Sequence, residues 1–284
     1  MKYILNVCLV VSLSLIFFSC EDKNVIKNIS EAPTEFTKKV LIEEFTGSWC
    51  GYCPSGAETL SNLISNNNKN VIGVAIHSGD PMATTHAEFL ENTYVSAGYP
   101  SGMIDRVSYD GIVCLNRGYW DWITQGQLVK TAICGLAIKS EVNGENANIE
   151  VHTSFDTTLN KDNYKLNVYL IEDNISQDGN GYDQRNYYNE DPQSSFYELG
   201  DPIINYKHNH TLRETLSVES LGDAFTKDIT PGITHVKEYS INISEYNKNN
   251  LSIVSFVVFI GENANDHEVL NVQKTDIDGV QDWD

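Results

Sequence analysis

The sequence contains few basic residues: 19 Lys and Arg stand against 39 Asp and Glu among 284 residues, for a formal net charge of −20. Nucleic-acid binding needs a positively charged face, so this composition argues against a nucleic-acid partner. Cysteine is also scarce, and six cysteines are too few for a disulfide scaffold in a chain of this length. The 41% of hydrophobic residues can build a core, and the length suits two domains.

One long apolar run lies at the N-terminus, where residues 3–18 are almost wholly hydrophobic. The run is shorter than the ~20 residues of a membrane-spanning helix and ends on Ser19-Cys20. A small residue before cysteine resembles a bacterial lipoprotein signal, so residues 1–19 are predicted as the signal peptide and Cys20 as the lipidated residue that anchors the chain in a membrane. The alternative is an ordinary signal peptide with an incidental cysteine. Residues 20–38 are polar and are predicted to form a flexible tether.

A C-x-x-C motif follows a predicted buried strand at residues 40–42. Its sequence is Trp49-Cys50-Gly51-Tyr52-Cys53-Pro54, and the apolar spacing of residues 55–66 predicts a helix directly after it. Unpaired N–H groups and the helix dipole favour a thiolate at a helix N-terminus. We therefore expect an exposed Cys50 that attacks a disulfide, and a shielded Cys53, one turn into the helix, that resolves the mixed disulfide.

Other uses of this motif stay open. Zinc needs four ligands, and the sequence has no second C-x-x-C, so neither a metal nor a cofactor is predicted. A purely structural Cys50–Cys53 disulfide would suit an exported protein.

Cys114 and Cys134 flank a predicted helix that would span roughly 24 Å, too far for a disulfide, so both are predicted to be buried thiols.

The motif resembles that of the thioredoxin superfamily, in which W-C-x-x-C-P follows a strand. Two further positions match: Glu44, which precedes Cys50 by six residues, and Pro100, which precedes a predicted strand. The resemblance implies that Glu44 is a buried acid that takes the proton of the resolving thiol. It also implies a cis Tyr99-Pro100 peptide, which would bind the substrate backbone together with Trp49.

The order of predicted elements agrees with this resemblance and implies a thioredoxin-like α/β domain at residues 39–132. After the first strand and helix come a strand at 70–76, a helix at 85–95, a strand at 102–106, a hairpin at 107–114 around Asp110-Gly111, and a helix at 116–131.

From residue 133 the apolar period becomes two, which is typical of strands. Strands are predicted at 133–142, 146–155, 164–172, 207–217, 235–243, 251–261 and 267–273. Short strands without intervening helices favour an immunoglobulin- or fibronectin-like β-sandwich over residues 133–284. Residues 173–206 are polar and are predicted to form a long surface loop, the natural place for a binding function.

The whole pattern resembles the outer-membrane-protein-28-related lipoproteins, with residues 98–102, 206–213 and 251–260 looking like segments of that family. The resemblance implies an outer-membrane lipoprotein of the cell envelope, on either the periplasmic face or the cell surface.

Two functions are therefore expected. One is a membrane-anchored thiol–disulfide oxidoreductase that acts on thiols or disulfides of protein substrates. The other is a scaffolding lipoprotein that binds an envelope protein or glycan through the sandwich and keeps a structural disulfide.

Overall fold

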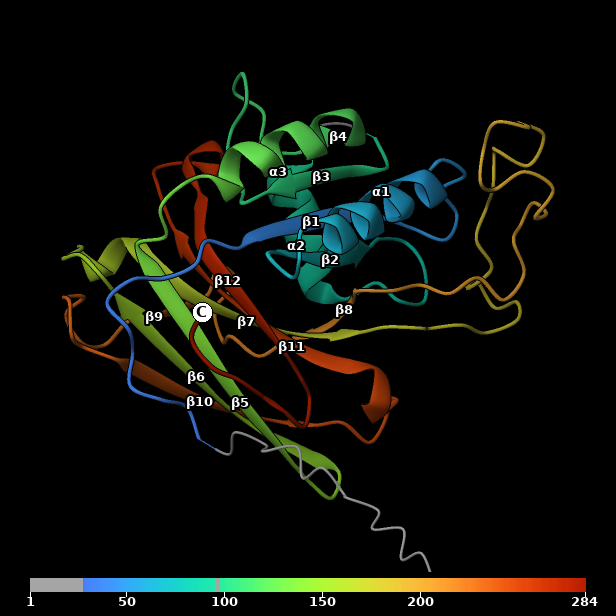
Figure 1. Cartoon of the computed structure of the whole chain (residues 1–284). Coiled ribbons are helices and arrows are strands. Elements are labelled where there is room, and N and C mark those ends of the chain that lie inside the picture. The colour runs from blue at the N-terminus through green and yellow to red at the C-terminus, as the bar shows by residue number, and fades with distance from the viewer. Residues whose placement is uncertain (1–27, 96–97) are drawn as a thin grey trace, which may run out of the picture.

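The computed structural model describes residues 28–95 and 98–284, which fold into two β-sheets flanked by α-helices (Figure 1). The larger sheet contains nine strands from both halves of the chain. The smaller sheet contains four strands, all from the C-terminal half. The fold is therefore mixed, with helices in the N-terminal half and almost only strands in the C-terminal half.

The N-terminal half alternates between strands and helices, as the sequence predicts. Its elements are β1 (Val40–Thr46), α1 (Cys53–Asn66), β2 (Val71–His77), α2 (Thr85–Tyr94), β3 (Ser101–Ile104), β4 (Leu115–Asn116) and α3 (Trp120–Leu128). β1 lies between parallel β2 and antiparallel β3. The helix predicted at 116–131 is shorter than expected, because its first turn is the 3-10 helix η1 (Arg117–Tyr119).

All strands predicted in the C-terminal half are present. The elements are β5 (Cys134–Asn143), β6 (Asn146–Phe155), β7 (Tyr164–Glu172), β8 (Thr211–Thr215), β9 (Asp223–Ala224), β10 (His235–Asn242), β11 (Leu251–Phe259), β12 (Glu268–Asp276) and β13 (Val280–Gln281). The pattern misses β9 and β13 because a two-residue strand has no period to detect. Leu166, Val168 and Ile253 of the larger sheet share one apolar core with Ile138 and Val151 of the smaller sheet, so the two sheets pack face to face.

Alternation along β1 places helices on both faces of the larger sheet. Val40 and Ile42 share a core with Leu60 of α1 and Trp120 of α3. Leu41, on the opposite face, shares a core with residues of α2 and of the C-terminal strands. Every residue of β1 is buried, which explains the apolar run at residues 40–42, and the two glutamates that follow this run are buried as well.

The two halves of the chain are joined through the larger sheet, which has the strand order β12-β11-β7-β8-β2-β1-β3-β4, with β9 paired to β7. The smaller sheet has the order β10-β6-β5-β13. β8 pairs with β7 of the C-terminal half and, at Ala75↔Thr211, with β2 of the N-terminal half. A buried ion pair reinforces the junction, because Arg106 donates from Nε and Nη2 to the two carboxylate oxygens of Glu43, each at 2.7 Å. Arg106 Nη2 also donates to the hydroxyl of Tyr169 on β7 at 3.3 Å.

The last part of the predicted tether packs against the folded chain. Ser30 O accepts a hydrogen bond from Trp283 Nε1 at 3.0 Å, and Lys38 Nζ lies 2.7 Å from the buried carboxylate of Asp105. The tether thus ends before residue 38, which is the boundary predicted from the sequence. The predicted signal peptide and Cys20 lie outside the described residues. Within the described part of the chain, none of the helices has the length and apolar character needed to cross a membrane.

Candidate functional site

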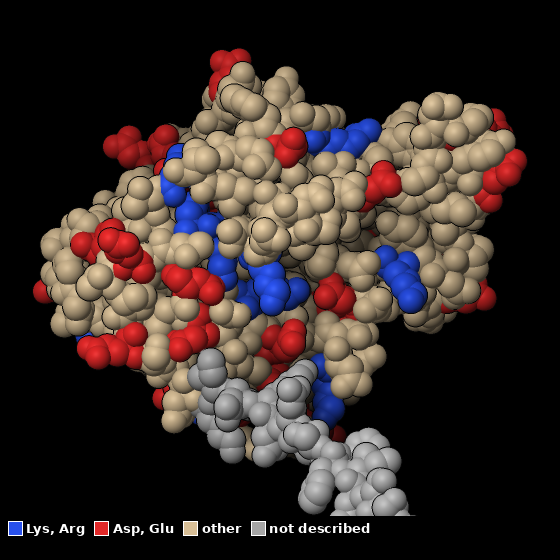
Figure 2. All heavy atoms as spheres, in the orientation of Figure 1, with Lys and Arg blue, Asp and Glu red and all other residues tan. Residues whose placement is uncertain are grey.

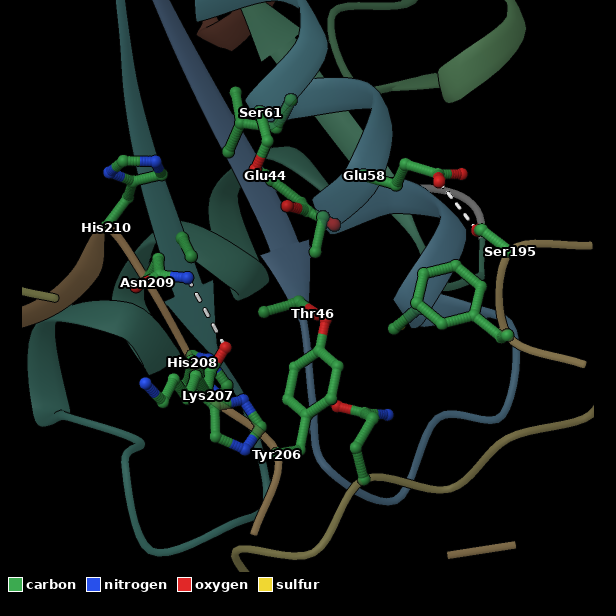
Figure 3. Close-up of a pocket in the computed structure, with 17 residues that line it drawn as sticks. Glu44, Thr46, Glu58, Ser61, Ser195, Tyr206, Lys207, His208, Asn209 and His210 are labelled. Atoms are coloured by element: carbon green, nitrogen blue, oxygen red, sulfur yellow. Dashed lines mark hydrogen bonds between the residues drawn. The ribbon is translucent and has the colours of Figure 1, made fainter. Parts of the chain in front are cut away.

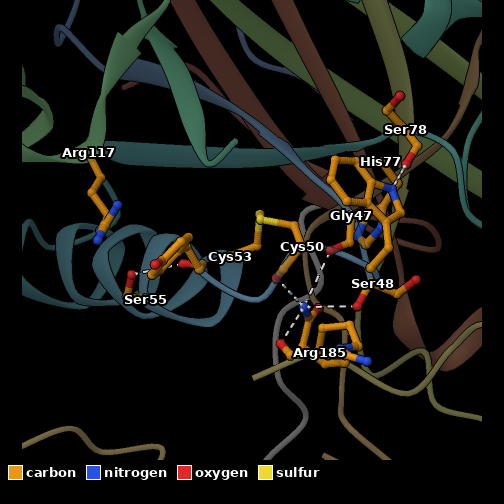
Figure 4. Close-up of a disulfide and its surroundings, with 12 residues drawn as sticks. Gly47, Ser48, Cys50, Cys53, Ser55, His77, Ser78, Arg117 and Arg185 are labelled. Carbon is orange, nitrogen blue, oxygen red and sulfur yellow. Dashed lines mark hydrogen bonds between the residues drawn. A yellow bond between two sulfur atoms is a disulfide. The ribbon is translucent and has the colours of Figure 1, made fainter. Parts of the chain in front are cut away.

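The C-x-x-C motif forms a disulfide between Cys50 and Cys53 in the turn that connects β1 to α1 (Figure 4). Backbone bonds from Cys50 N to Gly47 O at 3.0 Å and from Cys53 N to Cys50 O at 3.1 Å shape this turn. Cys53 is the first residue of α1, with Tyr52 as N-cap. The expectation that Cys53 lies one turn inside the helix is therefore wrong, because the helix begins at Cys53 itself.

Residues 173–210, here named the strap, leave β7 and pass the N-terminal end of α1 before they enter β8 (Figure 1). The strap docks on the disulfide turn through its backbone and one amide side chain. Arg185 N donates to Ser48 O at 2.7 Å and Tyr187 N donates to Gly51 O at 2.9 Å. The buried Gln184 Nε2 lies 3.3, 3.2 and 2.9 Å from the carbonyl oxygens of Gly47, Ser48 and Cys50.

Aromatic side chains complete the contact between the strap and the disulfide turn. The Tyr187 ring lies 2.4 Å from where a Cβ on Gly51 would stand, so only glycine fits at that position. Tyr52 meets the rings of Tyr187 and Tyr188 edge-on, at centroid distances of 5.1 and 5.8 Å. The Tyr188 hydroxyl in turn hydrogen-bonds Ser55 Oγ of α1 at 2.9 Å. The strap is therefore bound to the motif and not only near it.

Because the strap covers the turn, the two cysteines of the disulfide are less accessible than the sequence suggests. Cys50 is 5% exposed and Cys53 1% exposed, although Trp49 beside them is half exposed. The prediction of an exposed Cys50 is wrong, because sequence periodicity treats residues 173–206 as a free surface loop and cannot show that they return to the motif. Cys114 and Cys134 are free and buried, as predicted.

Glu44 lies beneath the motif on β1 and is 1% exposed. Burial raises the pKa of its carboxyl to about 8, although nearby Arg117 acts in the opposite direction. Its Oε1 has no hydrogen-bond partner in the described structure and lies 2.3 Å from where a Cβ on Gly56 would stand. Glycine at position 56 thus lets α1 approach the acid closely. Glu44 is a buried, protonated acid at neutral pH.

The remaining predicted site residues gather at the same place. The Tyr99-Pro100 peptide is cis, as predicted, and Pro100 Cβ lies 2.7 Å from the position of a Cβ on Gly56. The rings of Trp49 and Tyr99 pack edge-on with centroids 5.2 Å apart. Trp49 Nε1 also donates to Ser78 O at 2.6 Å. The structure therefore brings Glu44, Trp49, Tyr99 and Pro100 together around the disulfide.

A cavity of about 290 Å³ lies between α1 and the strap (Figure 3). Glu44 and Cys53 line one side, and Tyr206 and His208 of the strap line the other. Burial and the nearby His77 together lower the pKa of His208 to about 4. With Glu44 protonated and His208 neutral, this part of the cavity wall carries little charge at neutral pH.

Sequence reasoning missed the residues that hold the turn. Gln184 and Tyr187 lie in a polar stretch without a motif, and no local signal marks their partner. Asp80 is another such residue: its Oδ2 accepts from Ser48 N at 2.8 Å and lies 2.7 Å from His77 Nδ1. Although burial acts to raise the pKa of Asp80, the hydrogen bonds from His77 and Ser48 lower it.

Comparisons with known proteins place the chain in a family. The family model for "Outer membrane protein Omp28" matches residues 87–281. The structure is similar to HBP35 of Porphyromonas gingivalis, with a TM-score of 0.66 and 20% identity over 86% of this chain and 76% of that chain. A domain of the outer membrane lipoprotein Omp28 from Porphyromonas gingivalis is 17% identical, with a TM-score of 0.32 over 52% of this chain and 89% of that chain.

No curated protein matches the sequence. The family model covers most of the chain, in both halves of the fold. This chain therefore belongs to the Omp28 family of outer membrane proteins and is a protein of the cell envelope.

Proposed function

We propose that this lipoprotein binds an envelope partner and keeps Cys50–Cys53 as a structural disulfide that holds its binding surface. The observation that carries the proposal is the strap, which covers the disulfide turn through hydrogen bonds from Gln184, Arg185 and Tyr187. Thiol–disulfide exchange needs a thiolate to approach a sulfur atom directly. Two cysteines that are 5% and 1% exposed do not offer that approach while the strap is docked.

The same contacts produce a surface suited to binding. Tyr52 and Tyr187 are each about half exposed while their rings are held against each other. Leu199 and Ile204 of the strap are also about half exposed. A loop that is fixed on a rigid scaffold, with aromatic rings already in place, loses little conformational entropy when a partner binds. The disulfide stabilises this surface because it fixes the turn on which the strap rests.

A finer description of the fold accompanies this proposal. Residues 39–132 are a thioredoxin-like unit, and residues 133–284 are an immunoglobulin- or fibronectin-like sandwich from which the strap extends. The element order from β1 to α3 and the face-to-face packing of the two sheets support this description. The catalytic fold would then serve as a scaffold, since a fold does not fix a function.

The resistance of the disulfide to a reductant tests the proposal. The folded protein is incubated with excess dithiothreitol, free thiols are alkylated, and the masses are read over time. We expect Cys50–Cys53 to stay oxidised in the folded protein and to be reduced when urea is present, with no reduction of insulin by the folded protein. Rapid reduction in the absence of urea, together with insulin turnover, would overturn the structural assignment.

A second candidate function is thiol–disulfide oxidoreduction, which the position of Glu44 favours. A protonated carboxyl beneath Cys53, with the pKa raised to about 8, could exchange a proton with a thiol near neutral pH. In this function the Cys50 thiolate attacks a substrate disulfide, a Cys50–substrate bond forms and one substrate thiolate leaves. Cys53 then attacks Cys50, restores the Cys50–Cys53 disulfide and releases the reduced substrate.

Trapping of mixed disulfides with substrate proteins distinguishes the two functions. In an oxidoreductase, Cys53→Ser accumulates covalent adducts that a reductant releases, whereas Cys50→Ser does not. The binding function predicts no adducts with either variant. Adducts that form only with Cys53→Ser would establish the second function and identify its protein substrates.

A further inference from the structure

A second aromatic surface lies where α3 meets the hairpin at residues 107–112. Its members are Tyr109, Tyr119 and Trp122. The ring of Tyr109 meets that of Trp122 at a centroid distance of 5.1 Å and that of Tyr119 at 5.8 Å. The rings are 43%, 46% and 61% exposed for Tyr109, Tyr119 and Trp122. We propose that this surface, here named the platform, binds an uncharged glycan.

The fold does not need these rings. The core face of α3 is supplied by Trp120 and Ile123, which are buried, whereas Trp122 lies on the solvent face of the same helix. Burying a large apolar side chain stabilises a fold by roughly 1.5–3 kcal/mol, and that gain is largely absent for an exposed ring. Clustered exposed aromatic side chains of this kind mark interaction sites in soluble domains.

The platform is held rigidly before any ligand arrives. Tyr109 and Ile112 exchange backbone hydrogen bonds of 2.9 and 3.0 Å across Asp110 and Gly111. Both central residues have positive φ, 52° and 77°, which is the geometry of a type I′ turn and matches the hairpin predicted from Asp-Gly. Tyr119 closes η1 at the start of α3. Because a rigid turn and a helix position all three rings, stacking a ligand on them costs little ordering entropy.

The size of the platform favours a sugar chain over a protein. An aromatic side chain has roughly 150–250 Å² of surface, so three rings about half exposed offer on the order of 300 Å². A stable protein–protein contact buries about 800 Å² on each partner. The platform is large enough for one or two pyranose rings, whose C–H faces stack on aromatic π-faces, and too small for a stable protein contact on its own.

The charges around the platform select an uncharged ligand. Asp110 forms the tip of the hairpin and Asp121 precedes Trp122, and Figure 2 shows acidic side chains at the top of the molecule, where the hairpin rises. The nearest cation in the sequence, Arg117, is directed to the strap, where Nη2 donates to the Tyr188 hydroxyl at 3.0 Å. Carboxylates accept hydrogen bonds from sugar hydroxyls and repel sulfate, phosphate and uronate groups.

Affinity electrophoresis tests the proposal on the whole folded protein. Native gels are cast with soluble uncharged polysaccharides, namely a β-1,4-glucan, an α-1,4-glucan and a galactomannan, and with chondroitin sulfate as an anionic comparison. We expect retardation by at least one uncharged polysaccharide and none by chondroitin sulfate. Trp122→Ala and Tyr109→Ala should each weaken that binding at least tenfold, whereas Val129→Ala, an exposed apolar residue at the end of the same helix, should not.

The platform is independent of the disulfide, so the outcomes do not overlap with those of the proposed function. All three variants should keep wild-type thermal unfolding and wild-type resistance of Cys50–Cys53 to dithiothreitol. No retardation in any uncharged polysaccharide, or equal retardation of wild type and Trp122→Ala, would overturn the proposal. Binding of a lysine-rich peptide that Trp122→Ala abolishes, without polysaccharide binding, would assign the platform to a basic protein instead.

Discussion

Gln184→Ala removes the side chain that fixes the strap to the disulfide turn. The Gln184 Nε2 group lies within 3.3 Å of three turn carbonyls, those of Gly47, Ser48 and Cys50. An amide has two hydrogens, so at most two of these contacts are full hydrogen bonds at once. Each is worth about 1 kcal/mol net, and the carbonyls left without a donor add to the loss, so the docked strap should be destabilised by about 2–3 kcal/mol.

That loss of docking free energy should change the rate at which the disulfide is reduced, which can be measured. If reduction of Cys50–Cys53 requires the strap to open, each 1.36 kcal/mol increases the open population about tenfold, so Gln184→Ala should speed reduction roughly 30- to 150-fold. The assay follows thiol alkylation by mass during incubation with dithiothreitol. Gln193→Ala is the matched control, since Gln193 is an exposed residue of the same strap. Equal rates for wild type and Gln184→Ala would refute the reasoning that the strap shields the disulfide.

Three further outcomes are expected. Glu44 has a pKa of about 8 in the folded state against 4.5 ordinarily, so between these pH values the folded state keeps a proton that the unfolded state releases. The free energy of unfolding should therefore fall by up to about 1.4 kcal/mol per pH unit as pH rises through that window. Glu44→Gln should flatten this pH dependence, measured by urea unfolding at about pH 5 and about pH 7.5. Glu43→Gln leaves the buried Arg106 without its bidentate partner and should cost about 3–5 kcal/mol in the same measurement. Cys20→Ala should move the protein from the detergent phase to the aqueous phase after expression in a Gram-negative host, whereas a soluble, unacylated wild type would exclude lipidation.

Local sequence patterns predict the elements of this fold well. The helix after the motif and the alternating strand β7 (Tyr164–Glu172) each have a clear apolar period, and the buried strand β1 begins with an apolar run. The hairpin at Asp110-Gly111 follows from turn chemistry, because these residues tolerate positive φ. Such features depend on residues close together in the chain, which is why the sequence is sufficient for them.

Contacts between distant residues explain what the sequence does not reveal. Gln184 contacts a turn more than 130 residues earlier, and its polar surroundings resemble an ordinary loop. Arg106 and Glu43 are charged residues of types that are almost never fully buried unless paired, and their mutual hydrogen bonds let both be buried. The predicted site residues do gather, but the accessibility of the disulfide depends on the strap and could not be inferred from the motif.

The midpoint potential of Cys50–Cys53 tests the central claim most directly. The strap binds the turn in its disulfide-bonded form, so docking should stabilise the oxidised state and lower the potential. Equilibration of the folded protein in thiol–disulfide buffers, with alkylation and mass measurement, gives the midpoint. The account predicts a value below about −300 mV, the range of structural disulfides in exported proteins. A midpoint between about −270 and −120 mV, where catalytic dithiols lie, would contradict it.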